Sequence, residues 1–197
     1  FYLKGQEASD KFYYDEACQY FLKAVEIDPA FAIAHRGLAL ALRALGQSKE
    51  ASEAIEKAML LADRTTLKEK LFIQSSYVTI VEGDLGVEKN VQINRQLVEK
   101  FPKEKEAHYW LGDALWRVYM RGRRYEDRQD QHILDEVIRE LQTALDLDPD
   151  FTRTLEGLIT AHIQKGELEK ALEYAKRLEL KAPGEANSLH MLGEIYL

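Results

Sequence analysis

Histidine and cysteine are the side chains whose spacing could build a reactive site. The 197-residue chain has one cysteine, Cys18, and five histidines, at positions 35, 108, 132, 162 and 190. No two histidines have the spacing of a helical metal-ligand pair. Cys18 follows Ala17 in a sequence with no local charge pattern that would activate a thiolate. These residues predict no metal site and no nucleophile, and a single cysteine excludes an internal disulfide.

Glycine and the acidic residues form no catalytic motif either. The sequence contains no phosphate-binding loop, nucleophile elbow or dinucleotide-binding motif. The segment Gly83-Asp84-Leu85-Gly86 is too short for such a motif and falls in a turn between helices. Asp and Glu are spread along helix faces, as exposed helix surfaces require. We therefore expect no enzyme activity and no cofactor.

The composition favours a soluble globular chain built from long helices. Hydrophobic residues make up 46% and charged residues 31%, with only four prolines and eleven glycines, which excludes disordered and collagen-like classes. No apolar run is long enough for a membrane span. A net charge of −7 gives no bulk attraction to nucleic acid or anionic lipid. We expect a cytoplasmic protein, since no signal-peptide pattern is present, and a fragment of a longer one, since the chain opens on Phe1.

The prolines divide the chain into similar segments. Pro29, Pro102, Pro149 and Pro183 each follow an amphipathic run, where a helix has to stop. Their separations of 73, 47 and 34 residues fit a period of about 34 residues. The fit requires short insertions and one junction without proline, near Asp63.

Helices fill the segments between these stops. Apolar residues recur three and four apart, the pattern of a helix buried on one side. Gly46, Gly83 and Gly166 stand where a helix C-cap needs a left-handed residue, and Thr66 with Glu69 has the form of a capping box. The sequence predicts eleven helices, over residues 1–10, 14–27, 32–44, 48–62, 67–82, 87–100, 105–120, 131–146, 152–164, 168–181 and 186–197.

In this register the chain resembles the tetratricopeptide repeat, whose pattern sets Gly, Ala and an aromatic residue at fixed positions before a proline. Gly5, Ala17 and Phe21 fill those positions in the first repeat. The third repeat matches least well, because Asn90 and Asn94 stand where packing residues are expected. The resemblance covers essentially the whole chain and implies five repeats and the first helix of a sixth: 1–31, 32–65, 66–104, 105–151, 152–185 and 186–197.

The resemblance implies an all-α fold, a right-handed superhelical solenoid of antiparallel helix pairs, as a single repeat domain over residues 1–197. It also implies a protein–protein interaction module that binds a peptide or a helix of a partner in a concave groove, lined by the first helix of each pair. His35 and His108 fall in the tryptophan position of the repeat, which favours a packing role. The side chains expected to face the groove are Tyr2, Gln6, Arg36, Leu40, Arg43, Tyr77, Tyr109, Asp113, Trp116, Arg117, Arg153, Glu156 and Thr160.

The fourth repeat concentrates the aromatic residues of that set. One predicted helix holds both tryptophans of the chain and two tyrosines: Tyr109, Trp110, Trp116 and Tyr119. Aromatic residues beside arginine dominate binding hot spots, so Tyr109, Asp113, Trp116 and Arg117 form the expected centre of the groove. The alternative hypothesis is that the aromatic rings fill the interfaces with the helices at 87–100 and 131–146.

The arginines on the first helices and those near the insertion each allow two interpretations. The family's two-carboxylate clamp places Lys and Asn on successive first helices, and Tyr2, Gln6, Arg36 and Leu40 stand there instead, so a chaperone cofactor is not expected. Arg36 and Arg43 either hold an acidic partner or form a solvated face. The insertion at 120–131 contributes to a run of five arginines between 117 and 128, and it either contacts phosphate groups or is a solvated charged loop.

Two alternative functions follow from the same pattern. The array could be the regulatory or sensor segment of a larger bacterial signalling protein, such as a kinase, a cyclase or a transcription regulator, whose arrays the segment 144–151 resembles. It could also be a self-association scaffold, forming a homo-oligomer through the uncapped end at Leu189, Leu192 and Ile195.

Overall fold

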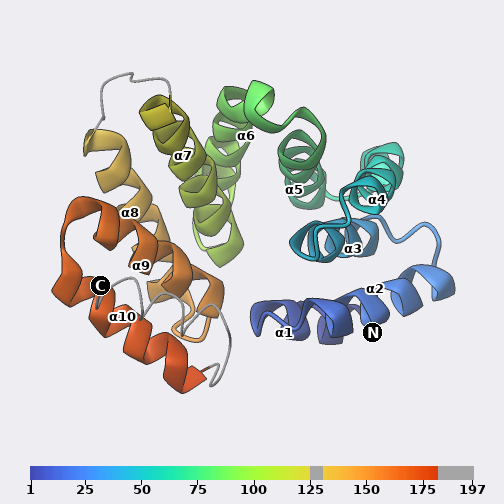
Figure 1. Ribbon diagram of the computed structural model, residues 1–197. Helices are drawn as coiled ribbons and strands as arrows, with labels where there is room; N and C mark the ends of the chain where they lie inside the picture. The colour runs from blue at the N-terminus through green and yellow to red at the C-terminus, as the bar shows by residue number, and fades with distance from the viewer. Residues whose placement is uncertain (125–130, 182–197) are drawn as a thin grey trace. The chain divides into compact units, whose positions relative to one another are not determined.

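The computed structural model describes residues 1–124 and 131–181, and helices dominate both ranges (Figure 1). No β-strand occurs within them. Contacts divide the chain into two compact units, residues 1–97 (unit 1) and 98–197 (unit 2), with the division inside the helix at Val87–Lys100. The α-helices are α1 (Tyr2–Asp10), α2 (Tyr14–Ile27), α3 (Ala32–Ala44), α4 (Ser48–Leu61), α5 (Leu67–Tyr77), α6 (Val87–Lys100), α7 (Lys105–Arg124), α8 (Gln131–Leu147), α9 (Thr152–Lys165) and α10 (Leu168–Lys181).

The predicted helix boundaries are confirmed to within a few residues, with two corrections. The helix expected over 67–82 ends as an α-helix at Tyr77 and continues as the π-helical turn η2 (Val78–Glu82) and the 3-10 turn η3 (Gly83–Gly86). A run of β-branched residues at 78–81 explains the change, because such side chains crowd the preceding helical turn. The helix expected over 105–120 extends to Arg124, since methionine and arginine are good helix formers.

Part of the expected insertion is therefore helical, and the remainder, residues 125–130, lies outside the described residues. The helix expected over 186–197 also lies outside them. The same holds for Leu189, Leu192 and Ile195, on which the self-association hypothesis depends.

Glycine ends two helices as the sequence predicts. Gly46 and Gly166 have φ angles of +76° and +79°, and the amide after each glycine donates to a carbonyl one turn back at 2.9 Å, as in a Schellman motif. Gly83 has a positive φ of 58° but a ψ of −130°, so it is not a left-handed helical cap. The capping box of Thr66 and Glu69 is confirmed, with both reciprocal hydrogen bonds present.

Small residues bring the helices of unit 1 together around Phe21. A Cβ atom on Gly5 of α1 would lie 2.7 Å from the Phe21 ring, and one on Gly37 of α3 would lie 2.6 Å from it. The Tyr2 ring also packs here, 5.9 Å from the Phe21 centroid and 5.1 Å from that of Phe31. Two glycines on first helices thus close on one large side chain of the second helix between them.

Hydrogen bonds replace this apolar packing between α5 and α6. Asn90 accepts a hydrogen bond from the Ser75 hydroxyl at 2.9 Å and donates one to the Thr79 hydroxyl. Asn94 donates to the Asn90 side-chain oxygen, and both asparagines are fully buried. The weak match of the third repeat therefore reflects a polar network at positions where other repeats use apolar side chains.

The two histidines in the tryptophan position make the same contact. Nε2 of His35 and of His108 each lies 3.0 Å from the carbonyl oxygen of the proline six residues earlier. A carbonyl only accepts, so Nε2 donates in both rings. His108 also places Nδ1 2.8 Å from a Glu140 carboxylate oxygen. Both rings are buried, in agreement with the expected packing role.

Candidate functional site

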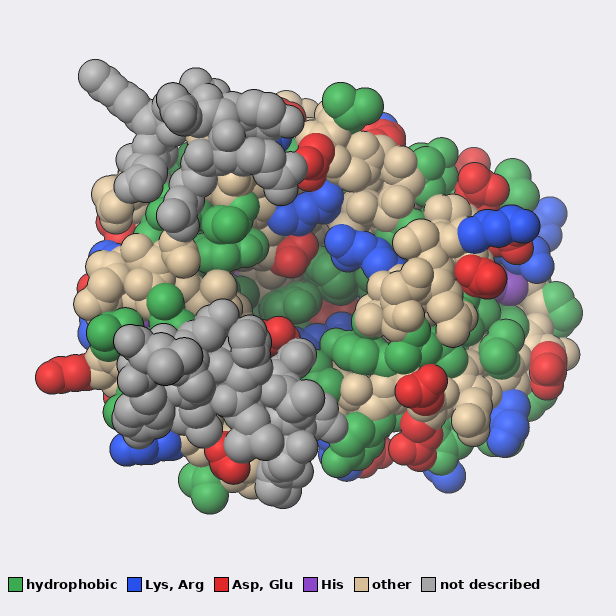
Figure 2. Space-filling model, in the orientation of Figure 1, with side chains coloured by type: hydrophobic (Ala, Val, Ile, Leu, Met, Phe, Trp, Pro, Cys, Tyr) green, Lys and Arg blue, Asp and Glu red, His purple; other side chains and the backbone are tan. Residues whose placement is uncertain are grey.

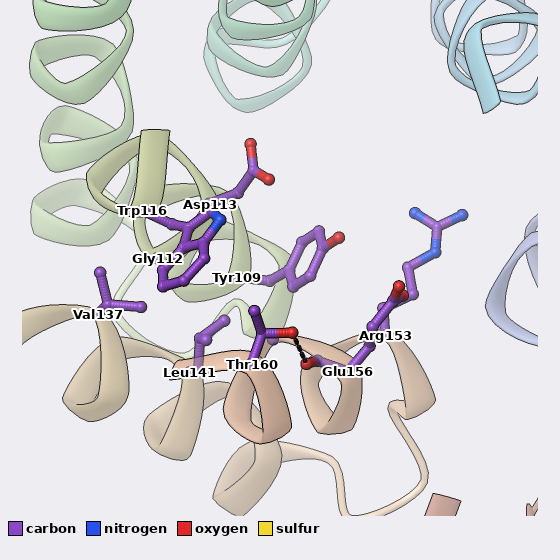
Figure 3. A pocket seen from close by; sticks show the side chains of 10 residues that line it. Tyr109, Gly112, Asp113, Trp116, Val137, Leu141, Arg153, Glu156 and Thr160 are labelled. Carbon is purple, nitrogen blue, oxygen red and sulfur yellow. Dashed lines mark hydrogen bonds between the residues drawn. The ribbon is translucent and has the colours of Figure 1, made fainter. Parts of the chain in front are cut away.

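Three helices of unit 2 enclose a pocket of about 230 Å³. Its lining comes from α7, α8 and α9, and the residues are Tyr109, Gly112, Asp113, Trp116, Val137, Leu141, Arg153, Glu156, Gly157 and Thr160 (Figure 3). Seven residues are predicted to face the groove from α7 and α9, and all of them except Arg117 are in this lining. The structure thus brings together side chains that are up to 51 residues apart in the sequence.

The pocket floor repeats the packing of unit 1 with a smaller side chain. A Cβ atom on Gly112 or on Gly157 would lie 2.8 Å from Leu141, so two glycines close on Leu141 as Gly5 and Gly37 close on Phe21. Leucine lacks the reach of a phenylalanine ring. A ring at position 141 would extend further than the Leu141 side chain, which is part of the pocket lining.

The pocket walls face one another across this floor. Figure 3 shows the rings of Tyr109 and Trp116 on α7 facing the side chains of α9, while the Asp113 carboxylate extends away from the floor. Neighbouring rings hold the aromatic walls: Phe151 packs edge-on against Tyr109 at 5.3 Å, and Tyr119 lies 5.6 Å from Trp116. On α9, the Thr160 hydroxyl donates to the Glu156 backbone carbonyl at 3.0 Å, which fixes the Thr160 rotamer.

Three charged residues line the pocket among the residues that the structure describes: the carboxylates Asp113 and Glu156, and Arg153. Burial raises the pKa of Glu156, and the Asp113 charge raises that pKa too, whereas the Arg153 charge lowers it. The net effect is upward, so the surroundings disfavour negative charge at Glu156.

Replacing Glu156 by glutamine is expected to stabilise the protein at neutral pH, because the folded surroundings raise the pKa of Glu156 and so disfavour its charged form there. The pKa of Glu156 is higher in the folded state than in the unfolded state. Stability is therefore fully present below the unfolded pKa, near 4.5, and falls as pH rises through the folded pKa. Urea unfolding at pH 7 and pH 3.5 tests this: the gain in the variant should vanish at pH 3.5, and an equal gain at both values would contradict a charge origin.

The remaining predicted groove residues lie outside this pocket, and Arg36 is a clear correction. Its side chain is only 5% exposed. Nε donates to the Ser76 hydroxyl at 2.8 Å and to the Phe72 carbonyl at 3.2 Å, and the guanidinium lies 5.0 Å from the Phe72 ring centroid. The hypotheses of a groove side chain and of a solvated face are both wrong for Arg36, because α5 offers it acceptors that no sequence pattern reveals.

The other six residues in this group differ in exposure. Arg43 is exposed. The other five are half-buried: Tyr2, Gln6, Leu40, Tyr77 and Arg117. None of these residues lines the pocket of unit 2.

The aromatic residues of α7 divide between the two hypotheses made for them. Trp110 and Tyr119 are buried, which agrees with the packing alternative. Tyr109 and Trp116 are half-buried and line the pocket. The sequence predicts none of Val137, Leu141 and Gly157 as a site residue, although the close approach of Gly112 and Gly157 to Leu141 follows from their register in the repeat.

Other chemistry finds little support in the part of the chain that the structure describes. No group of three or more His, Cys, Asp or Glu residues there could hold a metal ion. No helix in that part is long and apolar enough to cross a membrane. Burial raises the pKa of the Cys18 thiol to about 11, so the thiol stays protonated at neutral pH. Basic and acidic side chains are interspersed on the face shown in Figure 2.

Helix pairs that close on each other through glycine, with a proline after the second helix, define an all-α solenoid of repeated pairs. Sequence profiles of the tetratricopeptide repeat match residues 1–31, 37–64 and 130–194. The chain belongs to the tetratricopeptide repeat (TPR) family. The expected fold class, a right-handed superhelical solenoid of antiparallel helix pairs, is confirmed.

Known proteins with similarity to the chain agree with this fold. An uncharacterized protein of Methanocaldococcus jannaschii is 37% identical over 68 residues, which are 34% of this chain and 79% of that protein. A thermophilic TPR protein of Thermus thermophilus has a TM-score of 0.66 at 17% identity, over 100% of this chain and 97% of that one.

Two further solved structures have the same fold. YrrB, described as a TPR protein with an unusual peptide-binding site, has a TM-score of 0.53 at 20% identity, over 96% of this chain and 88% of that one. Human IFIT1, solved as a dimer with m7Gppp-AAAA, has a TM-score of 0.62 at 16% identity, over 91% of this chain and 45% of that one. The family is one of protein-interaction modules, typically without catalytic activity.

Proposed function

We propose that unit 2 binds a peptide or a helix of a partner protein, with the pocket between α7, α8 and α9 at the centre of the binding surface. The carrying observation is the convergence of Tyr109, Trp116 and Thr160, from two first helices, on one pocket. Aromatic side chains whose rotamers are already fixed by neighbouring rings lose little conformational entropy on binding. Such side chains therefore anchor interfaces.

The size of the pocket favours a peptide side chain over a free small molecule. Sites for small molecules usually measure about 300–1,000 Å³, and this pocket is smaller, at about 230 Å³. YrrB has the same fold and is described as having an unusual peptide-binding site, which supports a peptide as the class of ligand.

Replacing Leu141 by phenylalanine tests the proposal by filling the pocket. The substitution puts into unit 2 the side chain that Phe21 provides in unit 1, between an equivalent pair of glycines. We expect the affinity for peptides selected on the native protein from a random display library to fall at least tenfold. The free energy of unfolding should stay the same or rise, because the ring fills an existing cavity.

The reciprocal variant, Phe21→Leu, is the matched control. It removes a ring from the same packing position in unit 1 and should lower stability while leaving the selected peptides bound with native affinity. A folded Leu141→Phe variant that binds those peptides with unchanged affinity would show that the pocket is not the binding centre.

A further inference from the structure

The pocket of unit 2 includes the packing position that Phe21 occupies in unit 1. We propose that the pocket takes the ring of a phenylalanine side chain from the partner, seated on Leu141 beside Tyr109 and Trp116. This inference rests on the proposed function and specifies the chemistry of its ligand. Unit 1 supplies the template, because it holds a phenyl ring between two glycines and beside a tyrosine.

The two packing positions have matching neighbours. Phe21 and Leu141 each precede a proline by eight residues, and a Cβ atom on either flanking glycine would lie between 2.6 and 2.8 Å from the side chain in both units. Tyr2 in unit 1 and Tyr109 in unit 2 stand three residues before the first of these glycines. Each tyrosine ring lies beside the phenylalanine that follows the proline by two residues, at 5.1 Å in unit 1 and 5.3 Å in unit 2. The two positions therefore share one frame around different central side chains.

The central side chains differ in how far they reach. The Phe21 ring meets the glycines through its Cδ1, Cε1 and Cζ atoms, and its centroid lies 5.9 Å from that of Tyr2. Leu141 ends at its two Cδ methyl groups, which are its atoms nearest the glycines. The contact between Tyr2 and Phe21 thus has no aromatic counterpart at Leu141. A ring from the partner would supply that contact to Tyr109.

Unit 2 adds a second aromatic wall to the pocket. Trp116 stands at the position that Ser9 has in unit 1, four residues after the first glycine, and it lines the pocket together with Tyr109. Figure 3 shows both rings on the α7 side of the pocket, with Leu141 on the floor. Pairs of aromatic rings gain interaction energy beyond the area that they bury. The two walls therefore favour a ring over an aliphatic side chain.

The polar groups of the lining favour a neutral occupant. Asp113, Arg153 and Glu156 each already interact with other groups of the protein, and Figure 3 shows the Asp113 carboxylate and the Arg153 guanidinium extending away from the floor. A charged side chain would lose its water of hydration in the pocket without gaining a free counter-charge. A phenyl ring carries no charge, and its apolar faces match the floor formed by Val137 and Leu141.

Three small probes with different side chains test the inference: N-acetyl-phenylalanine, N-acetyl-leucine and N-acetyl-lysine, each as its N-methylamide. The chain has two tryptophans, so its indole N–H groups give two NMR signals, and a Trp116→Phe variant assigns them. We expect the phenylalanine probe to shift the Trp116 signal saturably, the leucine probe to bind at least fivefold more weakly, and the lysine probe to cause no shift.

The Leu141→Phe variant should abolish binding of the phenylalanine probe, because the protein's own ring then takes the place of the ligand. The matched control is Leu147→Phe, the same substitution at the end of α8. Leu147 is 41% exposed and does not line the pocket, so the control should change the affinity less than twofold. Urea unfolding of each variant verifies that it is folded.

The Tyr109→Leu variant tests the ring contact without filling the pocket, and it decides the matter if Leu141→Phe does not fold. Affinity for the phenylalanine probe should fall at least threefold, the size of one aromatic pair. Affinity for the leucine probe should change less than twofold, because leucine makes no contact between rings.

Equal binding of the phenylalanine and leucine probes would overturn the inference, as would tighter binding of the lysine probe, unchanged phenylalanine binding in a folded Leu141→Phe variant, equal losses for both probes in Tyr109→Leu, or no binding of any probe. These outcomes are distinct from failure of the proposed function. Selected peptides that lose affinity in Leu141→Phe but keep their affinity when leucine replaces their aromatic residues would uphold the binding site and reject a phenyl ring as its ligand.

Discussion

Replacing Phe21 by alanine is expected to lower the free energy of unfolding by about 4 kcal/mol. The Phe21 side chain is 2% exposed and lies between Gly5 and Gly37. Those glycines have no side chains that could move into the space left by the ring, so the cavity would persist. Urea unfolding followed by far-UV circular dichroism measures the loss.

Leu22→Ala is the control for this prediction. Leu22 is the next residue of α2, it is apolar as well, and it is 45% exposed. Its truncation should cost less than about 0.5 kcal/mol, as is usual for surface positions. A loss below about 1 kcal/mol for Phe21→Ala would mean that α1 and α3 collapse into the cavity and that the glycines do not set the helix spacing.

The same packing position explains why the fold could be predicted from the sequence. Two local signals predict the fold: a helix ends before each proline, and a small residue recurs on the first helix of each pair. Both signals can be recognised in a single sequence. Gly5, Ala17 and Phe21 could therefore be placed in register without a structure. Helix ends set by competing propensities were less predictable, as in η2, where β-branched residues shift α5 into a π-helical turn.

The pocket was predictable only in part. Tyr109, Asp113 and Trp116 could be assigned to one face of a helix, because helical periodicity fixes which residues share a face. The pocket is lined instead by Leu141, which is smaller than Phe21 at the equivalent position in unit 1, and both residues are simply apolar in the repeat pattern. The burial of Arg36 depends on a carbonyl and a hydroxyl of α5. Such tertiary hydrogen bonds produce no periodic pattern in the sequence.

Replacing Asn90 by alanine is expected to lower the free energy of unfolding by about 3 kcal/mol, because each buried polar group that loses its partner costs about 1–3 kcal/mol. The substitution removes the acceptor of the Ser75 hydroxyl, the acceptor of the Asn94 amide and the donor to the Thr79 hydroxyl. Urea unfolding gives the total loss, and hydrogen exchange of the α5 and α6 amides localises it.

Asn94→Ala separates the hydrogen-bond network from the loss of side-chain volume. Asn94 is buried like Asn90, but its side-chain oxygen has no hydrogen-bond partner, so truncation also removes an existing cost. We expect it to destabilise by at least 1 kcal/mol less than Asn90→Ala, and equal losses would contradict the network. Alanine is the residue that the repeat pattern places at position 90. A substitution toward the family pattern should therefore destabilise this protein, because α5 has adapted its own side chains to the asparagine.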